Sequence, residues 1–557
     1  MPRFVSFALL ATSAALVCAV PIGCGSSSPS DVTPAPNTDA DVAEGGAAPD
    51  VGADATAPTL TLTLTLDATE TEIVAGATAT LTSHVTRGPS SNGPITLTLV
   101  GLPSGVTAAP VTIADGQTDG TVTLSAAQGA TQGLAKISAA AALGAVTASA
   151  ATSLFVRGAP GTLDTSFAAS GVMFNTQPGV VELRAVAVQS DGKILVGGEL
   201  YAAPSTNALV TRIDEAGKLD PTFGTGGSAS TAFATGGAES FFSLAIAPGG
   251  SIVAGGFTYT GSANDRAIAA RMGADGKPDL SFNATGRYIT SFPGTEGARS
   301  LGMILQKDGK LTLLGQVPAG QGTWGVARVT AQGGTDAMFG GGGAVLPGAT
   351  SGTLWCGGEQ SDGNLVVAGG LYESGTLRWG ITRLIAATGA IDSGYGVFGF
   401  AKLSFPGVPS GIIACRIDPA DKLVSAGYLV EAGIGKIAVG RFGKDGTFDP
   451  MFHAGQPVSV PLGAGSAYPT GLFLQKDGKI VVAGNSPAGI LTVLRLGADG
   501  TLDPGFGSGG ALTTSGGLSG LVNLTYSGFD ESRRRVVLAG NANLGAAGGW
   551  FVSRVWL

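Results

Sequence analysis

Charged residues and histidines are scarce in this chain of 557 residues. Asp, Glu, Lys and Arg make up 13% of it, about half of the ~25% usual in soluble domains, and there are two histidines. His84 and His453 fall in different predicted domains, so we expect neither a histidine-based triad nor a multi-histidine metal site. The net charge of -8, a pI near 4.9 and the lack of any Lys/Arg-rich run argue against nucleic-acid binding.

Sequence motifs of common catalytic sites are also missing. The chain contains no GxSxG, P-loop or CxxC pattern. We therefore assign no catalytic residue, no metal site and no cofactor.

Glycine, in contrast, is abundant, with 92 copies, and much of it lies in a repeated segment. A five-residue signature, in which an aspartate stands three positions before a closing aromatic residue, occurs seven times. Successive closing aromatics are 56, 59, 57, 56, 57 and 54 residues apart. A regular period of this length indicates a supersecondary repeat. The copies are Leu163–Phe167, Leu219–Phe223, Pro278–Phe282, Thr335–Phe339, Ile391–Tyr395, Phe448–Phe452 and Leu502–Phe506.

Two further markers keep the same period, so three markers agree on seven units. One is an apolar run after a turn, and the other is an arginine before each signature. The runs begin at Ile194, Ile252, Leu311, Leu365, Leu423, Ile480 and Val536. The arginines are Arg212, Arg271, Arg328, Arg383, Arg441, Arg495 and Arg554.

Each unit is predicted to be all-β. Its apolar stretches are short, rich in Val, Ile, Leu and Thr, and bounded by Gly and Asp-Gly turns. In the second unit we expect strands at Ser228–Phe233, Phe241–Ala247, Ile252–Phe257 and Ala267–Met272. Four such strands make one blade of a β-propeller, and neighbouring blades bury one another's apolar faces. We predict a seven-bladed β-propeller with four-stranded blades of about 57 residues over residues 158–557.

The ends of the repeat region predict how the ring closes. The first signature has no strand set before it, while the chain stops at Val552–Leu557, directly after an arginine strand. We expect the segment around Gly161–Phe167 to complete the blade that begins at the carboxyl terminus. Such an overlap removes the free edges at which an open sheet would aggregate.

The repeat resembles a known family. The stretches DGKILVGG (Asp191–Gly198) and TRIDEAGKLDPTFGTGG (Thr211–Gly227), repeated at Asp477–Gly484 and Leu494–Gly510, are similar to the delta-60 repeat of bacterial surface and secreted proteins. The resemblance covers roughly Ala159 to Leu557. It implies a β-propeller but supplies no catalytic or ligand residue, because that family has no assigned activity.

The amino terminus predicts export. Phe4–Val20 is an apolar stretch that follows one positive charge, and the chain turns polar after Cys24, which is typical of an export signal. Gly23-Cys24 resembles the lipobox of bacterial lipoproteins, although Pro21 departs from the usual leucine. The resemblance implies that residues 1–24 are a lipoprotein-type signal, that Cys24 carries the lipid, and that the protein is held at the outer membrane or cell surface of a Gram-negative-type bacterium. A secreted or periplasmic protein is the alternative.

Two segments separate this signal from the repeats. Residues 25–57 are acidic, rich in Pro, Ala and Ser, and free of aromatic and basic residues, so we predict a disordered tether. Residues 58–157 contain short alternating stretches such as Thr59–Leu66, which predict a β-sandwich. Ile95–Thr107 and Thr121–Ala126 resemble bacterial immunoglobulin-like domains, which implies a spacer or adhesion module.

The repeated aspartates and arginines allow two interpretations. Pairs such as Asp275/Asp279 and Asp445/Asp449 suggest calcium loops, but calcium takes six to eight oxygen ligands. We favour a structural role, in which Asp-Gly forms hairpin turns and the signature aspartate accepts backbone N–H bonds. The arginines would then pack around the ring or pair with the signature aspartates.

Two cysteines remain after Cys18 in the signal and Cys24 are set aside. Cys356 stands nine residues before Leu365, and Cys415 stands eight before Leu423. One separation is odd and the other even, so the two side chains are expected on opposite faces of their sheets. Opposite parity in adjacent blades would let them face each other, and an exported protein permits a disulfide. The sequence gives no distance between them and leaves this bond open.

Function is expected where the seven copies differ. On the strands that we take as innermost, Asn175, Arg287, Tyr288 and Lys402 replace the Ala, Ser, Thr or Val of other copies. We predict that they line the central channel and contact an anionic or sugar-like ligand there. Solvated channel residues without a ligand are the simpler alternative.

Two functions follow from these features. The first is an exported, lipid-anchored cell-envelope protein that acts as a non-enzymatic binding scaffold for a protein or glycan, as a monomer that reaches the membrane through its lipid. The second is a propeller enzyme, a carbohydrate hydrolase or lyase with its site in the central funnel. Such an enzyme needs two carboxylates at a fixed separation. The strands taken as innermost supply almost none, so we favour binding.

Overall fold

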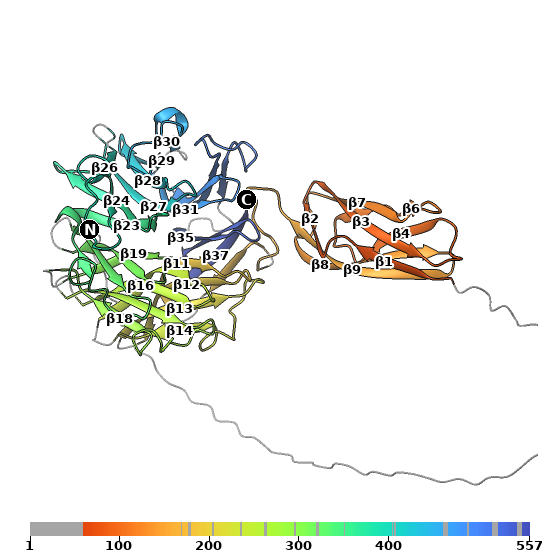
Figure 1. Cartoon of the computed structure of the whole chain (residues 1–557), viewed down its shortest axis with the longest axis horizontal. Coiled ribbons are helices and arrows are strands. Elements are labelled where there is room, and N and C mark those ends of the chain that lie inside the picture. Colours follow the sequence, from red (N-terminus) through yellow and green to blue (C-terminus); the bar gives the residue numbers. More distant parts are fainter. Residues whose placement is uncertain are drawn as a thin grey trace, which may run out of the picture. The chain divides into compact units, whose positions relative to one another are not determined.

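The structure is a computed structural model, and almost all of the regular secondary structure in its described part is β-strand (Figure 1). The exceptions are two 3-10 turns, η1 (Pro347–Ala349) and η2 (His453–Gly455). No described helix is long and apolar enough to cross a membrane. The predicted signal with Cys24 and the predicted tether lie outside the described residues. These residues are 60–557 without 169, 176–179, 203–204, 234–236, 261–263, 294–296, 319–321, 350, 404, 406–407, 461–465, 487–489, 515–521 and 543–548.

Two sheets form the first part of the described chain. Alternation in the sequence decides which side chains they bury, so that Leu62 and Leu64 point inward while Thr63 and Thr65 face solvent. Leu64 and Val122 of one sheet pack with Ile95 of the other in a shared core, which makes a β-sandwich. One sheet has the order β1 (Leu62–Leu66), β3 (Thr78–Arg87), β7 (Asp119–Ala126), β5 (Val106–Ala108). The other has the order β2 (Glu70–Val74), β9 (Val146–Arg157), β8 (Gly133–Leu143), β4 (Ile95–Val100), β6 (Val111–Ile113).

The repeats form antiparallel groups of four strands, each in chain order. Four groups are separate sheets. They are β19 (Arg299–Leu305), β20 (Leu311–Val317), β21 (Thr323–Val329), β22 (Ala344–Val345); β23 (Gly352–Glu359), β24 (Leu365–Glu373), β25 (Thr376–Leu384), β26 (Phe400–Leu403); β27 (Ser410–Ile417), β28 (Leu423–Glu431), β29 (Ile434–Phe442), β30 (Val458–Val460); and β31 (Tyr468–Leu474), β32 (Ile480–Ser486), β33 (Ile490–Leu496), β34 (Ala511–Thr514).

Two more groups share one sheet, because a single parallel bridge, Thr206 to Ala238, joins them. The first of these groups is β11 (Val180–Val188), β12 (Ile194–Ala202), β13 (Ser205–Ile213) and β14 (Ser228–Thr231). The second is β15 (Ala238–Ile246), β16 (Ile252–Tyr259), β17 (Arg266–Met272) and β18 (Arg287–Thr290).

The last sheet contains both ends of the repeat region. It has the order β10 (Val172–Asn175), β37 (Gly549–Trp556), β36 (Arg535–Ala542), β35 (Val522–Asp530). Phe174 pairs with Phe551, and Leu163 forms a bridge with Val555. An amino-terminal strand therefore completes the carboxyl-terminal sheet, as the sequence predicted, although the strand itself begins at Val172.

First strands meet at the centre of this β-propeller arrangement. Each contacts the first strand of the next group in a closed circuit, β11–β15–β19–β23–β27–β31–β35–β11. The fourth strands, such as β18 and β26, pair only with the third strand of their own group and form its edge. Between the groups lie apolar layers, for example fully buried Leu314 and Val326 against Leu354 and Val367. The first strands therefore form the wall of the channel.

Candidate binding site

The repeated arginine and the repeated signature form one structural unit in every copy. In the second unit, Arg271 Nε donates to Asp279 Oδ2 at 2.7 Å, and its guanidinium carbon lies 5.0 Å from the centroid of the Phe282 ring. The other oxygen of Asp279 accepts the backbone N–H of Ser281 at 3.0 Å. The equivalent ion pairs are Arg212–Asp220, Arg328–Asp336, Arg383–Asp392, Arg441–Asp449, Arg495–Asp503 and Arg554–Asp164.

The same arginines also connect neighbouring groups. Arg271 Nη1 donates to the backbone oxygen of Ala331 at 2.6 Å, and Arg441 Nη1 donates to that of Ala498 at 2.6 Å. Each acceptor lies in the turn of the following copy. The repeated residues are therefore occupied in holding the ring together and are not available as a ligand site.

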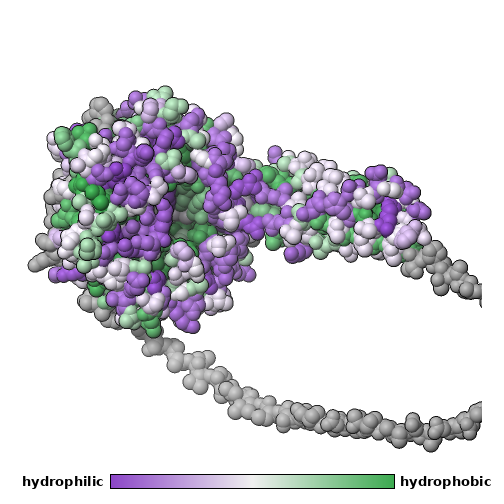
Figure 2. All heavy atoms as spheres, viewed as in Figure 1, coloured by the Kyte–Doolittle hydropathy of each residue, from purple (hydrophilic) through white to green (hydrophobic). Residues whose placement is uncertain are grey.

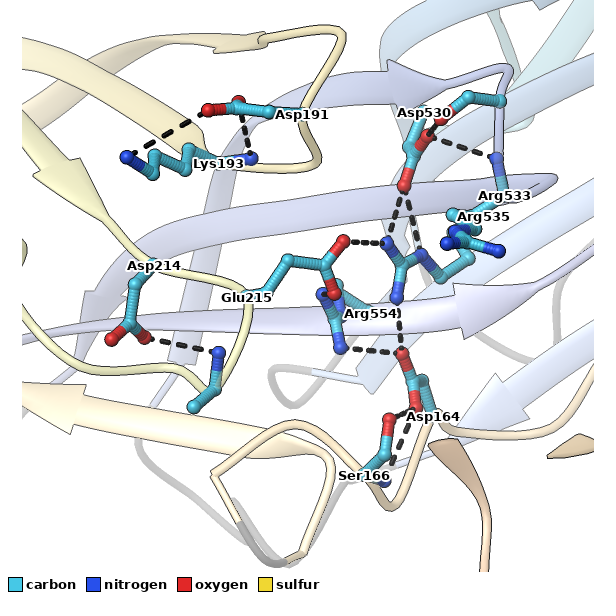
Figure 3. A network of polar contacts seen from close by, with 12 residues as sticks. Asp164, Ser166, Asp191, Lys193, Asp214, Glu215, Asp530, Arg533, Arg535 and Arg554 are labelled. Carbon is cyan, nitrogen blue, oxygen red and sulfur yellow. Dashed lines mark hydrogen bonds and ion pairs between the residues drawn. The ribbon is translucent and has the colours of Figure 1, made fainter. Parts of the chain in front are cut away.

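The seam where the ends meet has its own set of charges (Figure 3). Arg535 takes the place that a lysine holds in most other copies. It contacts Asp164 at 3.0 Å, Asp530 at 2.6 Å and Glu215 at 2.8 Å. Arg554 contacts the same Asp164 at 2.7 Å and Glu215 at 3.3 Å. Figure 3 shows these five side chains pointing toward one another, so segments at opposite ends of the repeat region share one ionic network.

Because the network is buried, each of its charged side chains depends on the others for its stabilisation. The side chains of Arg535 and Arg554 are 1% exposed and that of Asp164 is fully buried, whereas Glu215 is 47% exposed. Desolvation lowers the pKa of Arg554, helped by the nearby charge of Arg535. Desolvation also acts on Arg535, but the carboxylates of Asp530, Glu215 and Asp164 outweigh it and raise its pKa. Two buried cations thus depend on these acids.

Candidate metal ligands do not gather elsewhere in the described chain. Within residues 60–557, less the gaps given above, no group of three or more His, Cys, Asp and Glu side chains could hold a metal ion. His84 lies on the sandwich between Asp67 and Asp119, and the hydrogen bond to Asp119, followed by that to Asp67, raises its pKa. His453 lies in η2, in a different part of the fold.

Every first strand is bulged at the same register. In β27, for example, the pairing with β28 shifts between Ile412 and Ala414, which leaves Ile413 as the extra residue. A bulge bends a strand and re-aims its side chains. The bulged residues are Arg184, Phe242, Leu301, Trp355, Ile413, Thr470 and Thr525. A position that repeats in backbone geometry thus differs in side chain from copy to copy.

A cavity of about 300 Å³ lies where these strands converge, at the centre of the ring. Figure 2 shows a hollow in the middle of the repeat region, with hydrophobic atoms in its wall. The position after each bulge explains the space, because it is small in all copies except one. The residues there are Ala185, Ser243, Gly302, Cys356, Ala414 and Gly471, with Tyr526 as the exception.

Arg416 is the cation in the wall of this cavity. Its side chain is exposed to the cavity, and its Nη1 donates to the backbone oxygen of Cys415 at 2.8 Å. Its guanidinium carbon lies 5.7 Å from the centroid of the Phe473 ring. Among the described residues it forms no ion pair, and desolvation by the surrounding protein lowers its pKa. In the other copies the same position is Ala187, Ala245, Ile304, Gly358, Phe473 and Gly528.

Two hydroxyl groups accompany this cation in the wall. Burial raises the pKa of Tyr526 to about 12, so its phenol stays protonated and can donate a hydrogen bond. Ser527 Oγ is buried and has no hydrogen-bond partner among the described residues. Arg184, close to Tyr526, is by contrast paired with Glu182 and lies 4.7 Å from the Phe242 ring centroid.

The remaining wall is apolar and aromatic. Phe242 and Trp355 are half-buried bulge residues that line the cavity, and Phe473 stands beside Arg416. The wall residues include no Asp or Glu among the described part of the chain. The arrangement can therefore present one cation, the Tyr526 hydroxyl and flat apolar surfaces, but no carboxylate.

The residues predicted to line the channel lie elsewhere. Asn175, Arg287, Tyr288 and Lys402 are on the fourth strands β10, β18 and β26, at the edges of their sheets. Tyr288 is buried and shares a hydrogen bond of 2.9 Å with Thr335, and Lys402 pairs with Glu373 at 2.8 Å. That placement was wrong, because the glycine-rich, bulged first strands take the centre and leave the short fourth strands outside.

A disulfide joins two first strands beside the cavity. Cys356 of β23 and Cys415 of β27 are bonded, with their Cα atoms 5.7 Å apart. The parity difference in the sequence corresponds to this geometry, since the two strands contact each other as neighbours in the ring. The bond fixes the residue that precedes Arg416 and whose carbonyl group Arg416 contacts.

A second cavity, of about 580 Å³, lies at the ends of β27 and β31. Ile417 and Leu474 form part of its floor. Its polar groups are partly occupied within the protein, since the backbone N–H of Lys307 donates to Glu359 and that of Ser361 donates to Asp421, both at 2.7 Å. We therefore consider the central cavity the stronger candidate.

Comparisons with known proteins support the fold more than any function. A family model described as "Domain of unknown function (DUF5122) beta-propeller" matches residues 189–223 and 475–506. These segments include two copies of the signature, so the match supports a β-propeller. A search of curated proteins found no match.

Solved structures show only distant likeness. A quinonprotein alcohol dehydrogenase-like protein from Bacteroides thetaiotaomicron is 12% identical, with a TM-score of 0.29 over 80% of this chain and 95% of that one. A mannose phosphorylase from Leishmania mexicana is 10% identical, with a TM-score of 0.27 over 57% of this chain and 80% of that one. Domains 4 and 5 of the S-layer protein SbsC are 16% identical, with a TM-score of 0.14, and the match spans 18% of this chain and 53% of that one.

Proposed function

We propose that this chain is an exported, lipid-anchored protein of the cell envelope whose propeller binds a glycan or another surface component without converting it. One observation carries the proposal. The residues that build the ring repeat in every copy. The bulge positions of the first strands differ, and five of them line a cavity whose cation, Arg416, has no ion pair among the described residues. A wall that varies on a constant frame is typical of a binding site.

The architecture we propose is a seven-bladed member of the delta-60 repeat proteins, preceded by an immunoglobulin-like domain. The closed circuit of first strands supports the ring, and the two packed sheets at residues 62–157 support the sandwich. The sandwich would act as a spacer that holds the propeller away from the membrane.

Export and lipidation at Cys24 rest on the sequence of residues 1–24. The disulfide between Cys356 and Cys415 supports an oxidising compartment. Mass spectrometry of the membrane fraction tests the anchor, because a diacylated Cys24 is expected at the mature amino terminus. An unmodified mature amino terminus, or a Cys24→Ala protein that still fractionates with membranes, would contradict it.

An enzyme that cleaves carbohydrate is the weaker candidate. Most glycoside hydrolases use two carboxyl groups about 5–10 Å apart. The cavity wall offers Arg416 and Tyr526 but no carboxyl group among its described residues. This composition favours binding over hydrolysis.

A glycan array with parallel turnover assays on cell-envelope polysaccharides tests the proposed function. We expect binding without product formation. Ala414→Leu should weaken binding, because Ala414 lies in the wall and a larger side chain fills part of the cavity. Lys402→Gln, on an outer edge strand, is the matched surface control. Release of shortened products, or binding unchanged by Ala414→Leu in a protein of normal thermal stability, would refute the proposed site.

A further inference from the structure

We infer that the central cavity selects a small ring compound that carries a carboxylate, such as a uronic acid or an aryl carboxylate, with Arg416 as the partner of the carboxylate. The inference rests on the proposed binding function and names its ligand. It follows from the charge, the donors and the shape of the wall.

The first argument is that Arg416, unlike the arginines of the repeated unit, has no carboxylate partner among the described residues. The arginines of the repeated unit each have a carboxylate partner, and so does Arg184. Arg416 alone among the wall residues carries a charge, and it has no such partner among the described residues. Its exposed side chain lines the cavity, so an anion that enters can pair with it there. A bound carboxylate would supply that anion.

The second argument is that the guanidinium group of Arg416 is already positioned to bind a planar anion. One of its five N–H groups donates to the carbonyl of Cys415, and the Phe473 ring lies 5.7 Å from it, which leaves other N–H groups free for the cavity. Arginine binds carboxylates through two parallel hydrogen bonds. Because the disulfide fixes Cys415, the guanidinium is held before the ligand arrives.

The third argument is the room around the cation. About 300 Å³ is at the lower end of small-molecule sites, so a single ring or the end of a glycan fits better than an extended chain. Trp355 and Phe242 offer flat faces, and the Tyr526 hydroxyl offers a hydrogen bond. No acidic side chain in the described wall would repel a carboxylate.

Isothermal titration calorimetry of the full-length protein, purified in detergent, tests the inference. The probes are glucuronate and benzoate, with glucose and benzyl alcohol as their neutral analogues and inorganic phosphate as a non-carboxylate anion. We expect one or both carboxylates to bind at least tenfold more tightly than their neutral analogues, and which of them binds identifies a sugar or an aryl ligand. Arg416→Gln should weaken carboxylate binding ten- to a hundredfold, since a hydrogen bond to a charged group contributes about 1.5–3 kcal/mol.

Thermal stability separates a binding role of Arg416 from a structural one. Arg416→Gln should leave the melting temperature nearly unchanged, because the exposed side chain of Arg416 forms no ion pair among the described residues. Arg328→Gln, which breaks the buried pair with Asp336, should lower it. Lys402→Gln again serves as the control for loss of an outer cation, and it should leave both binding and stability unchanged.

The results distinguish the two proposals. Neutral analogues or phosphate that bind as tightly as the carboxylates, or carboxylate binding that Arg416→Gln leaves intact, would overturn the inference while the binding function stands. If no probe binds and glycan binding is insensitive to Ala414→Leu, the channel is not the site and both proposals fail. A lower melting temperature for Arg416→Gln would assign Arg416 to the framework and overturn the inference.

Discussion

Asp164→Asn should destabilise the propeller far more than the same change at an ordinary copy of the signature. Asp164 is fully buried and forms ion pairs with two arginines that are 1% exposed. The substitution leaves Arg554 with Glu215, at 3.3 Å and half-exposed, as its remaining acid. Breaking a buried ion pair by removing one partner costs about 3–5 kcal/mol.

Asp279→Asn is the matched control. Asp279 occupies the same position of its signature, is also followed two residues later by a serine whose N–H it accepts, and pairs with a single arginine. Its side chain is 27% exposed and that of Arg271 is 18% exposed. Water can therefore replace part of the lost interaction, and we expect a loss of about 1–1.5 kcal/mol.

Differential scanning calorimetry gives the comparison. With an unfolding entropy of about 2.1 cal/mol/K per residue over roughly 400 propeller residues, 1 kcal/mol corresponds to a shift of about 1.2 °C. We expect Asp164→Asn to lower the melting temperature by roughly 4–6 °C and Asp279→Asn by roughly 1–2 °C. Equal shifts for the two variants would refute the view that the closing seam depends on shared, buried charges.

Three other predictions concern closure, acid stability and the disulfide. Deletion of Val552–Leu557 removes the partner of β10, so we expect an insoluble or protease-sensitive product; a soluble protein with an unchanged melting temperature would contradict the closed ring. Desolvation raises the pKa of Asp449, but hydrogen bonds, that from Lys422 foremost, outweigh it and hold the value at about 2. Because this pKa is below its ordinary value, the stability that Asp449 contributes should be complete above about pH 4 and should disappear as the pH falls toward 2. Urea titrations at a series of pH values measure this loss, and in the Asp449→Asn protein the free energy of unfolding should depend less on pH. Replacing Cys356 and Cys415 by serine opens a loop of 59 residues and should reduce the free energy of unfolding by about 4 kcal/mol, whereas a loss below about 1 kcal/mol would mean that the bond contributes little.

The repeat itself made most of the fold predictable. Its period located the strands, and the fixed order of Arg271, Asp279 and Phe282 in every copy suggested an ion pair at the corner, which the structure confirms. Closure was predictable because the last strand, β37, ends without a signature after it. Local patterns are sufficient for these features because they depend on neighbouring residues.

The channel wall was not predictable in the same way. We expected polar residues at the centre and therefore chose Arg287 and Lys402, but the centre is occupied by strands of small and apolar residues. A bulge such as that at Ile413 breaks the period-two alternation, so the sequence does not show which side chains face the cavity. One signal was present, because Arg416 is the one charged residue at a position that is uncharged in the other copies.

The common register of the bulges has a consequence for how such a protein can change over generations. A substitution at Trp355 or Thr470 alters the wall without touching the arginine, aspartate or aromatic residue that fastens one copy to the next. Mutations that create a new specificity are therefore not required to destabilise the ring, and they can accumulate one copy at a time. The residues that hold the ring together can thus stay the same while the residues of the cavity wall change.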